Sequence, residues 1–321
     1  MTNALRLITV FGGGGFVGRY VVEALCRAGY RVRVAERHPK NAYRLQPLGA
    51  VGQIERVAAD ISRPGHVMTA MQGAEAVVNL VGSFNGDLDA VHVDGAHNVA
   101  DAAKSLGMKA VVHISAIGAD PDSESSYART KGEGETMVRE VFAKATILRP
   151  SVLFGAEDDF TNRFARMAAL PVLPVLAPDT KFAPLYVADL AKAVLAAVRH
   201  PERHGGKIYE LGGPDVMDMR TINRKVASMA GRPAEPLELP DAIGSLMSRF
   251  GWLPGAPLSR DQWIMLQSDN VPDKRKPSIR DLGVEPVAMD ALAPEWLGRY
   301  KNGGRFAPPV AGAPGPSSPV A

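Results

Sequence analysis

A run of glycines that follows a short β-branched segment constrains the fold of this chain more than any other feature. Residues 8–18 read Ile-Thr-Val-Phe-Gly-Gly-Gly-Gly-Phe-Val-Gly, which predicts a strand, a tight turn and the start of a helix. Gly12 permits the turn, Gly15 lets the backbone approach a phosphate, and Gly18 lets the helix and the strand pack closely.

The helix predicted to begin at Phe16 and Val17 offers free N–H groups at its positive end, where a pyrophosphate can bind. A G-x-x-G-x-x-G motif alone has low specificity. Here it follows the first strand and opens a helix within a strand–helix–strand unit, which is the context that a dinucleotide site requires. The turn therefore predicts a bound dinucleotide, and a flexible glycine loop is the alternative.

The remainder of the first half alternates short, continuous Val/Ile-rich runs with helical patterns. The predicted strands are Arg6–Phe11, Arg31–Glu36, Glu55–Ala58, Ala76–Leu80, Ala110–Ile114 and Ala145–Leu148, and the clearest helical patterns are Val17–Ala28, Val91–Leu106 and Tyr127–Phe142. Continuous apolar runs are typical of strands covered on both faces. We therefore expect an α/β fold with a doubly wound parallel sheet, a Rossmann domain, over residues 1–150.

After residue 150 the pattern becomes irregular, with frequent prolines, an amphipathic helix at Val187–Arg199 and a strand at Lys207–Leu211. This predicts a smaller C-terminal lobe over residues 151–306, packed on the first domain, with some strands and helices returning to it. Residues 307–321 are nearly all Pro, Ala, Gly, Ser and Val, so we expect a disordered tail.

Composition excludes several classes of protein. The net charge of +3 and the lack of a basic tract argue against nucleic-acid binding. Cys26 is the only cysteine, which excludes a disulfide framework and a cysteine-based zinc site and fits a reducing compartment. No signal peptide, transit peptide or run of about 18 apolar residues is found, so we expect no transmembrane segment. We also expect no metal site. The expected location is the cytoplasm, or the cytoplasmic face of the inner membrane as a peripheral partner.

The end of the second predicted strand bears on which dinucleotide binds. An acidic side chain there accepts from the ribose 2′-hydroxyl of NAD, whereas an arginine holds the 2′-phosphate of NADP. Glu36 and Arg37 are both present, and a strand alternates its faces, so only one of them can point at the ribose. Arg37 lies at the exit of the strand, and His38 and Lys40 add positive potential. This favours NADP(H) over NAD(H), with a solvated loop charge as the alternative for Arg37.

Two further strand ends fit the same site. Asp60 and Ile61, just after the third strand, are expected to hydrogen-bond and cover the adenine ring. Leu80, Val81 and Gly82 end the fourth strand, where small residues would let the backbone approach the cofactor.

Tyr127 and Lys131 lie four residues apart and are stacked on one face of a predicted helix. A phenol with a pKa of about 10 is a poor acid–base group at neutral pH. A neighbouring ammonium, and an oxidised nicotinamide ring, favour the phenolate and lower that pKa. The lysine can also donate to the nicotinamide ribose, so the pair is expected at the cofactor.

These motifs together resemble the extended and atypical short-chain dehydrogenase/reductase superfamily, including Leu148-Arg149-Pro150-Ser151 at the end of the sixth strand. More narrowly, residues 131–135 and 149–164 look like the nucleotide-binding accessory subunit of respiratory complex I (NADH:ubiquinone oxidoreductase) and its bacterial relatives. The resemblance implies an NADPH with a structural or regulatory role, in an accessory or assembly factor linked to complex I or quinone metabolism. It implies cofactor contacts from the three glycines, Arg37, Asp60, Tyr127 and Lys131, and from Pro150 and Ser151.

The superfamily's active members also need a Ser or Thr hydroxyl just past the fifth strand, to polarise the substrate carbonyl. Ser115 is the only hydroxyl available there, because Ala116 and Ile117 follow it, and Phe11 stands where relatives commonly carry threonine. The alternative function is therefore an oxidoreductase or epimerase acting on a small carbonyl or a sugar nucleotide. Tyr127 would then be the acid–base and Ser115 the carbonyl polariser, within about 3 Å of each other.

A possible partner surface lies in Leu239–Trp252, where apolar residues repeat at helical spacing. Packing against the chain's own lobe is one interpretation of this stripe, which comprises Ile243, Leu246, Met247 and Phe250. Docking to a membrane surface or to a complex I subunit is the other.

Overall fold

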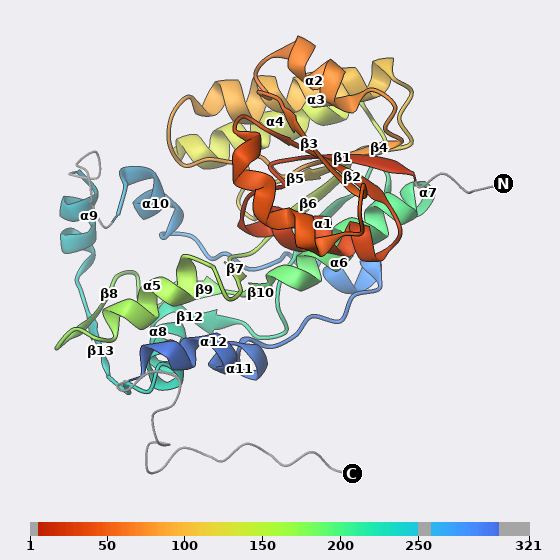
Figure 1. The fold of residues 1–321 in the computed structure, drawn as a ribbon. Coiled ribbons are helices and arrows are strands. Elements are labelled where there is room, and N and C mark those ends of the chain that lie inside the picture. The colour runs from red at the N-terminus through yellow and green to blue at the C-terminus, as the bar shows by residue number, and fades with distance from the viewer. Residues whose placement is uncertain (1–5, 250–257, 302–321) are drawn as a thin grey trace.

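The computed structural model describes residues 6–249 and 258–301, and a parallel sheet of seven strands lies at its centre (Figure 1). The strands are β1 (Leu7–Phe11), β2 (Arg31–Glu36), β3 (Ile54–Ala58), β4 (Ala76–Asn79), β5 (Ala110–Ile114), β6 (Thr146–Pro150) and β11 (Ile208–Leu211). Their order in the sheet is β3-β2-β1-β4-β5-β6-β11, so the direction of winding reverses between β1 and β4. The predicted α/β, doubly wound sheet is confirmed.

Helices cover both faces of this sheet (Figure 1). Helices α1 (Phe16–Arg27) and α6 (Val187–Arg199) lie on one face, and α2 (Pro64–Met71), α3 (Gly95–Ser105) and α4 (Ser126–Val141) lie on the other. Side chains alternate along each strand between the two apolar layers: in β1, Ile8 and Val10 join the layer under α1 and α6, whereas Phe11 joins the layer under α2–α4. Burial on both faces explains why the strands read as continuous apolar runs.

Two local segments differ from the sequence expectation. The chain after β2 forms a 3₁₀ segment, η1 (Pro39–Leu48), which buries Ala42 and Leu45. The helix expected over Val91–Leu106 is preceded by a π-helical turn, η2 (Asp89–Asp94), before α3 begins. Such turns follow from tertiary packing rather than from local apolar periodicity.

Beyond residue 150 the chain both completes the sheet and builds smaller units. β11 forms the sheet edge beside β6, and α6 packs against α1. Three two-stranded ladders follow: β7 (Leu153–Phe154) with β10 (Leu185–Tyr186), β9 (Lys181–Phe182) with β12 (Met217–Asp218), and β8 (Leu173–Val175) with β13 (Pro236–Glu238). The other helical segments are α5 (Phe160–Met167), α7 (Pro201–His204), α8 (Met219–Met229), α9 (Asp241–Arg249), α10 (Arg260–Met265), η3 (Ile279–Leu282), α11 (Met289–Leu292), α12 (Pro294–Leu297) and η4 (Gly298–Tyr300).

A separate apolar core, which includes Phe154, Phe182 and Ile222, holds these smaller units together. The expected division at residue 150 and the limits of the lobe remain predictions. The expected tail, residues 307–321, lies outside the described residues. Within the described ranges, no helix has the length and apolar character needed to cross a bilayer.

Two side chains from the C-terminal half tie it to the sheet domain. Asp261 of α10 accepts hydrogen bonds from the backbone N–H groups of Ser126 and Tyr127, at 2.7 and 2.8 Å, and so caps α4. The Asn270 side chain accepts from the N–H of Val152 at 3.0 Å and from the hydroxyl of Ser151 at 2.7 Å. The helix that carries Tyr127 is therefore held at its start by a residue from the other half of the chain.

Gly134 allows α4 to lie against η2, and its replacement tests this packing. A Cβ at Gly134 would lie 2.1 Å from the carbonyl oxygen of His92, whereas a Cβ at Gly65 in α2 would meet no atom within 4 Å. We expect Gly134→Ala to lower the free energy of unfolding by about 1–3 kcal/mol. Gly65→Ala, the matched control, should leave it unchanged or raise it by up to about 1 kcal/mol. Denaturant titration measures both values, and equal stability of the two variants would contradict the packing argument.

Candidate functional site

The glycine turn joins β1 to α1 at the carboxyl end of the sheet. Gly12 has a φ of 77°, in the left-handed region that favours glycine. A Cβ at Gly18 would lie 2.3 Å from the carbonyl oxygen of Gly13, so only glycine lets α1 start this close to the turn. The structural roles expected of both glycines match this geometry.

Gly15 differs, because the protein itself does not require a glycine at that position. A Cβ there would meet only the carbonyl oxygen of Gly12, at 3.4 Å, and the backbone φ is −77°. Gly15 is the N-cap of α1, and no side chain caps the helix. The bare backbone and the uncapped helix start fit an anion such as a pyrophosphate.

The end of β4 lies against this turn. A Cβ at Gly12 would lie 3.3 Å from the carbonyl carbon of Leu80 and from the backbone nitrogen of Val81. Because β1 and β4 are the neighbours between which the winding reverses, this junction is the point where ligands bind in doubly wound sheets. Gly82 continues the same edge, and a Cβ there would lie 4.0 Å from Nε2 of His92.

Glu36, rather than Arg37, faces the glycine turn. Its carboxylate accepts the N–H of Gly14, whereas Arg44 of η1 donates to the carbonyl oxygen of the same glycine. Arg37 is exposed and lies near Asp60. The sequence did not single out Arg44, because the 3₁₀ segment that carries it was not foreseen.

Asp60 and Ile61 follow β3, and both form hydrogen bonds to other residues of the protein. Asp60 accepts from the hydroxyl of Ser62 at 2.7 Å, and this hydrogen bond, with a smaller contribution from the Arg37 charge, lowers the pKa of Asp60. Ile61 is buried, and its carbonyl accepts from Asn98 at 3.1 Å. A carboxylate oxygen of Asp60 therefore stays available to a ligand on this side of the turn.

The Tyr127 ring is half-buried and packs against two other rings. Phe84 stacks on it with centroids 4.2 Å apart, and His92 meets it edge-on at 5.4 Å. Burial raises the pKa of Tyr127 to about 12. The expectation that Lys131 lowers this pKa is therefore wrong for this structure: burial is the only cause of the shift, and Lys131 contributes nothing that opposes it.

Lys131 is buried, and its Nζ donates to the carbonyl oxygen of Ile114 at 2.6 Å. Burial lowers the pKa of Lys131 to about 8, against the opposing charge of Glu135. An ammonium has three donors, so two remain for a ribose hydroxyl. With a pKa of about 8, the lysine is still mostly protonated at pH 7 and can donate to a cofactor there.

Both ring nitrogens of His92, in the π-helical turn η2, are hydrogen-bonded. Nε2 accepts from the N–H of Ser83 at 3.0 Å, so Nδ1 carries the proton and donates to the hydroxyl of Thr130 at 2.9 Å. Burial, reinforced by the charge of Lys131, lowers the pKa of His92 to about 4. The neutral imidazole therefore ties the loop that carries Phe84 to α4.

Ser115 and His113 lie at the carboxyl end of β5. The Ser115 hydroxyl is buried and has no hydrogen-bond partner, so it does not bond to the Tyr127 phenol. Nε2 of the buried His113 also has no partner, and its Nδ1 lies 3.2 Å from the Asn79 amide nitrogen. Unpaired buried polar atoms are uncommon in folded proteins, and two of them at a strand end are typical of a site that binds a ligand.

The Arg149-Pro150-Ser151 run makes internal contacts. Arg149 lies between the buried carboxylates of Glu135 and Glu210, at 2.7 and 3.3 Å, and so ties α4 and β6 to β11. The carbonyl of Pro150 accepts from the N–H of Ile117 at 3.1 Å, and the Ser151 hydroxyl bonds to Asn270. Cofactor contacts from Pro150 and Ser151 stay predictions.

The buried Lys131 predicts a pH dependence of stability. Its pKa falls from 10.5 to about 8 on folding, so the unfolded chain binds more protons between these two values. The cost of burying the charge is complete below about pH 8 and is relieved as the pH rises towards 10.5.

We therefore expect the wild type to gain stability relative to Lys131→Met across that window. Denaturant titrations at a series of pH values measure the difference. Lys104→Met, at an exposed lysine of α3, is the control and should give a difference that does not change with pH. A flat difference for Lys131→Met would show that the folded protein keeps this ammonium charged.

Comparison with known proteins agrees with this geometry. Residues 8–212 match the model of the NAD dependent epimerase/dehydratase family. The mitochondrial NADH dehydrogenase (ubiquinone) 1 alpha subcomplex subunit 9 of Mus musculus is 32% identical over 303 residues, 92% of this chain and 80% of that protein. The ceramide reductase of Caulobacter vibrioides is 29% identical over 272 residues, 80% of this chain and 82% of that protein.

Among solved structures, the NADPH-dependent quinone oxidoreductase QOR2 of Escherichia coli, complexed with NADPH, aligns with a TM-score of 0.74. It is 23% identical, and the alignment covers 90% of this chain and 99% of that one, which shows a shared fold. The family match spans the glycine turn, the Tyr127–Lys131 pair and β11. The chain belongs to the NAD dependent epimerase/dehydratase family, within the short-chain dehydrogenase/reductase superfamily, and is homologous to subunit 9 of the complex I alpha subcomplex.

Proposed function

We propose that this protein holds NADP(H) as a structural or regulatory cofactor and acts as an accessory or assembly factor linked to complex I or quinone metabolism. The observation that carries the proposal is the state of Tyr127. Its ring packs against Phe84 and His92, burial raises its pKa to about 12, and Ser115 makes no hydrogen bond to it. A phenol in this state is a poor acid–base catalyst at neutral pH.

The binding part of the proposal rests on features that do not require turnover. The bare Gly15 backbone, the uncapped start of α1 and the two free donors of Lys131 suit a pyrophosphate and a ribose. When bound, the dinucleotide would supply a nicotinamide ring that can carry a hydride. The residues of this chain would bind and orient it.

The preference for NADP(H) rests on two guanidinium groups near the turn. Arg44 already contacts the Gly14 carbonyl, and Arg37 lies at the exposed exit of β2. Glu36 opposes this preference, since its carboxylate would repel a 2′-phosphate placed beside it. Its hydrogen bond to Gly14 occupies one carboxylate oxygen, and the arginines then supply the positive charge that the phosphate needs.

The accessory part of the proposal is supported by α9. This helix buries its small residues: a Cβ at Gly244 would lie 2.3 Å from the Trp263 ring. Its large apolar side chains face outward instead, with Ile243 40% and Leu246 56% exposed. Packing of the whole stripe within its own lobe is therefore wrong for these two residues, and Phe250 lies outside the described residues. We propose that this surface meets a partner subunit or a membrane, and that the protein lies at the cytoplasmic face of the inner membrane.

Identification of the nucleotide in gently purified protein tests the cofactor proposal. We expect NADPH to remain through dialysis and to resist oxidation by added quinones, aldehydes or sugar nucleotides, as measured by mass spectrometry and by absorbance of the reduced nicotinamide. Tyr127→Phe should keep the nucleotide and the slow background oxidation. Prompt turnover that falls by about 10²–10⁴-fold in Tyr127→Phe would instead establish the oxidoreductase or epimerase alternative.

Substitutions at the exit of β2 test the selectivity. Arg37→Gln should weaken NADPH but not NADH, by about 1.5–3 kcal/mol for a lost charge-assisted phosphate contact. Lys104→Gln removes an exposed positive charge on α3 and is the control. Glu36→Gln should strengthen NADPH relative to NADH. Calorimetric titration measures each affinity, and equal losses of both cofactors in Arg37→Gln would show that Arg37 does not contact the 2′-phosphate.

A further inference from the structure

A cleft with a volume of about 910 Å³ lies away from the glycine turn, between the end of α6 with α7 and the segment 275–283. Lys207, on its wall, immediately precedes β11, and its carbonyl oxygen accepts from Ile147 at the start of β6. The cleft is therefore at the amino-terminal edge of the sheet, whereas dinucleotides bind at the carboxyl edge. It does not belong to the cofactor site.

Positive side chains dominate the walls of this cleft. Five of its thirteen lining residues are lysine or arginine, two are histidine, and one, Asp281, is acidic. The lysines and arginines are Arg203, Lys207, Arg275, Lys276 and Arg280. The carbonyl end of α6 contributes only about half a negative charge, which is too little to balance them.

These cations differ in how they are paired. Arg203 and Lys207 form no ion pair or side-chain hydrogen bond with any residue in the described ranges. Arg275 pairs with Asp273, and Arg280 with Glu285, but the two arginine side chains are 90% and 60% exposed, so such pairs are weak and open to exchange. Only Lys276 is firmly held, by the buried carboxylate of Glu210 at 2.8 Å.

The positive field reaches the buried wall of the cleft. His204 is buried and its Nδ1 lies 2.8 Å from the Tyr209 hydroxyl. Burial lowers the pKa of His204, and the charges of Lys207, His200 and Arg203 lower it further. The charge of Glu202 opposes them but contributes less, so the net field at His204 is positive.

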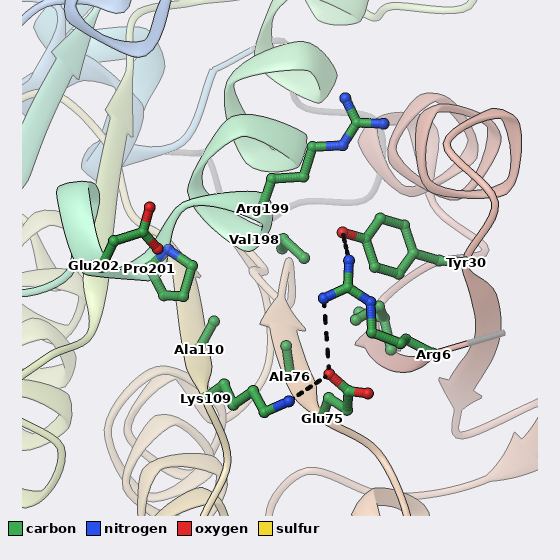
Figure 2. A pocket seen from close by; sticks show the side chains of 11 residues that line it. Arg6, Tyr30, Glu75, Ala76, Lys109, Ala110, Val198, Arg199, Pro201 and Glu202 are labelled. Carbon is green, nitrogen blue, oxygen red and sulfur yellow. Dashed lines mark hydrogen bonds and ion pairs between the residues drawn. The ribbon is translucent and has the colours of Figure 1, made fainter. Parts of the chain in front are cut away.

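A neighbouring hollow provides a comparison, because two of its lining cations pair with one carboxylate. It has a volume of about 220 Å³, and Val198, Arg199, Pro201 and Glu202 are among its lining residues (Figure 2). There Glu75 pairs with Lys109 at 3.1 Å and with Arg6 at 4.0 Å, as Figure 2 shows. The hollow has a carboxylate in ion-pair contact with two cations, whereas in the larger cleft Asp281 lies near Lys207, and Glu202 near Arg203, without forming an ion pair.

We infer that the larger cleft binds the phosphate group of an organic phosphate, either a soluble phosphate ester or the headgroup of an acidic phospholipid. Several cations around one space match the oxygens of a phosphate, and arginine binds phosphate with two parallel hydrogen bonds. The Tyr209 ring and Leu282 are both buried, so the walls offer no exposed aromatic or large apolar surface for a base or an acyl chain. The volume of the cleft leaves room for the organic group that is esterified to the phosphate, and the cations would bind the phosphate itself.

The double variant Arg203→Gln/Lys207→Gln tests the inference, with Lys104→Gln/Arg139→Gln as control. Both doubles remove one lysine and one arginine charge, and the control residues are exposed on α3 and α4. The probes are inorganic pyrophosphate, measured by calorimetry in saturating NADPH, and phosphatidylcholine vesicles with or without phosphatidic acid, measured by sedimentation. Denaturation midpoints should match the wild type, because neither Arg203 nor Lys207 makes an ion pair to lose.

We expect the wild type and the control to bind at least one probe equally, and the cleft variant to bind it about tenfold more weakly. A loss confined to pyrophosphate assigns the cleft to a soluble ester, and a loss confined to phosphatidic acid vesicles assigns it to a lipid headgroup. The inference is overturned if the wild type binds neither probe, if all three proteins bind equally, or if both doubles lose binding to the same extent.

Discussion

The first half of the structure depends on how closely α1 packs against the turn that precedes it. Because a Cβ at Gly18 would lie 2.3 Å from the Gly13 oxygen, the first turn of α1 can press directly on the end of β1. This contact leaves the uncapped helix start open where the winding of the sheet reverses. α6 in turn packs on α1, so the same contact also places a helix from the second half of the chain.

Burial, rather than charge, sets the chemistry on the other side of this opening. Lys131 and Tyr127 would favour each other's charged forms in water, yet the pKa of the lysine falls to about 8 and that of the tyrosine rises to about 12. Both shifts favour the neutral form, as loss of water does for any ionisable group. Burial has the same effect on His92, whose pKa falls to about 4, so its imidazole is also neutral. At neutral pH Tyr127 and His92 are therefore neutral, and Lys131 is the member of this group that still carries a charge.

The sequence predicted those parts of the fold that local pattern controls. Six strands of the sheet were predicted to within two residues at each end, since the central strands, buried on both faces, are continuous apolar runs and β2 and β3 still keep Val or Ile at buried positions. The glycine turn was predicted because its spacing reflects backbone geometry. The π-helical turn before α3 was not, because it depends on Gly134, some forty positions away in the chain.

Contacts between distant parts of the chain account for what the sequence did not predict at the site. Asp261 caps α4 from 134 residues away, and nothing around it distinguishes it from a solvated helix acid. Because side chains alternate along β2, only one of Glu36 and Arg37 can face the turn. Which of them does so depends on which face of the sheet each position occupies, and the sequence pattern does not show this. Phe84 lies in a loop, and its stacking on Tyr127 follows from the His92–Ser83 hydrogen bond, which has no periodic signature.

The Tyr-x-x-x-Lys motif by itself therefore says little about catalysis in this chain. Lys131 donates to the backbone of β5, and the Tyr127 ring fills the space between Phe84 and His92. Removing Lys131 would leave a buried carbonyl without its donor, and removing Tyr127 would cost its contacts with two rings, and both changes destabilise folded proteins. Packing alone gives the chain a reason to retain the pair. The hydroxyl that active members of the superfamily place beside the tyrosine has no such structural role, and here Ser115 stays unbonded.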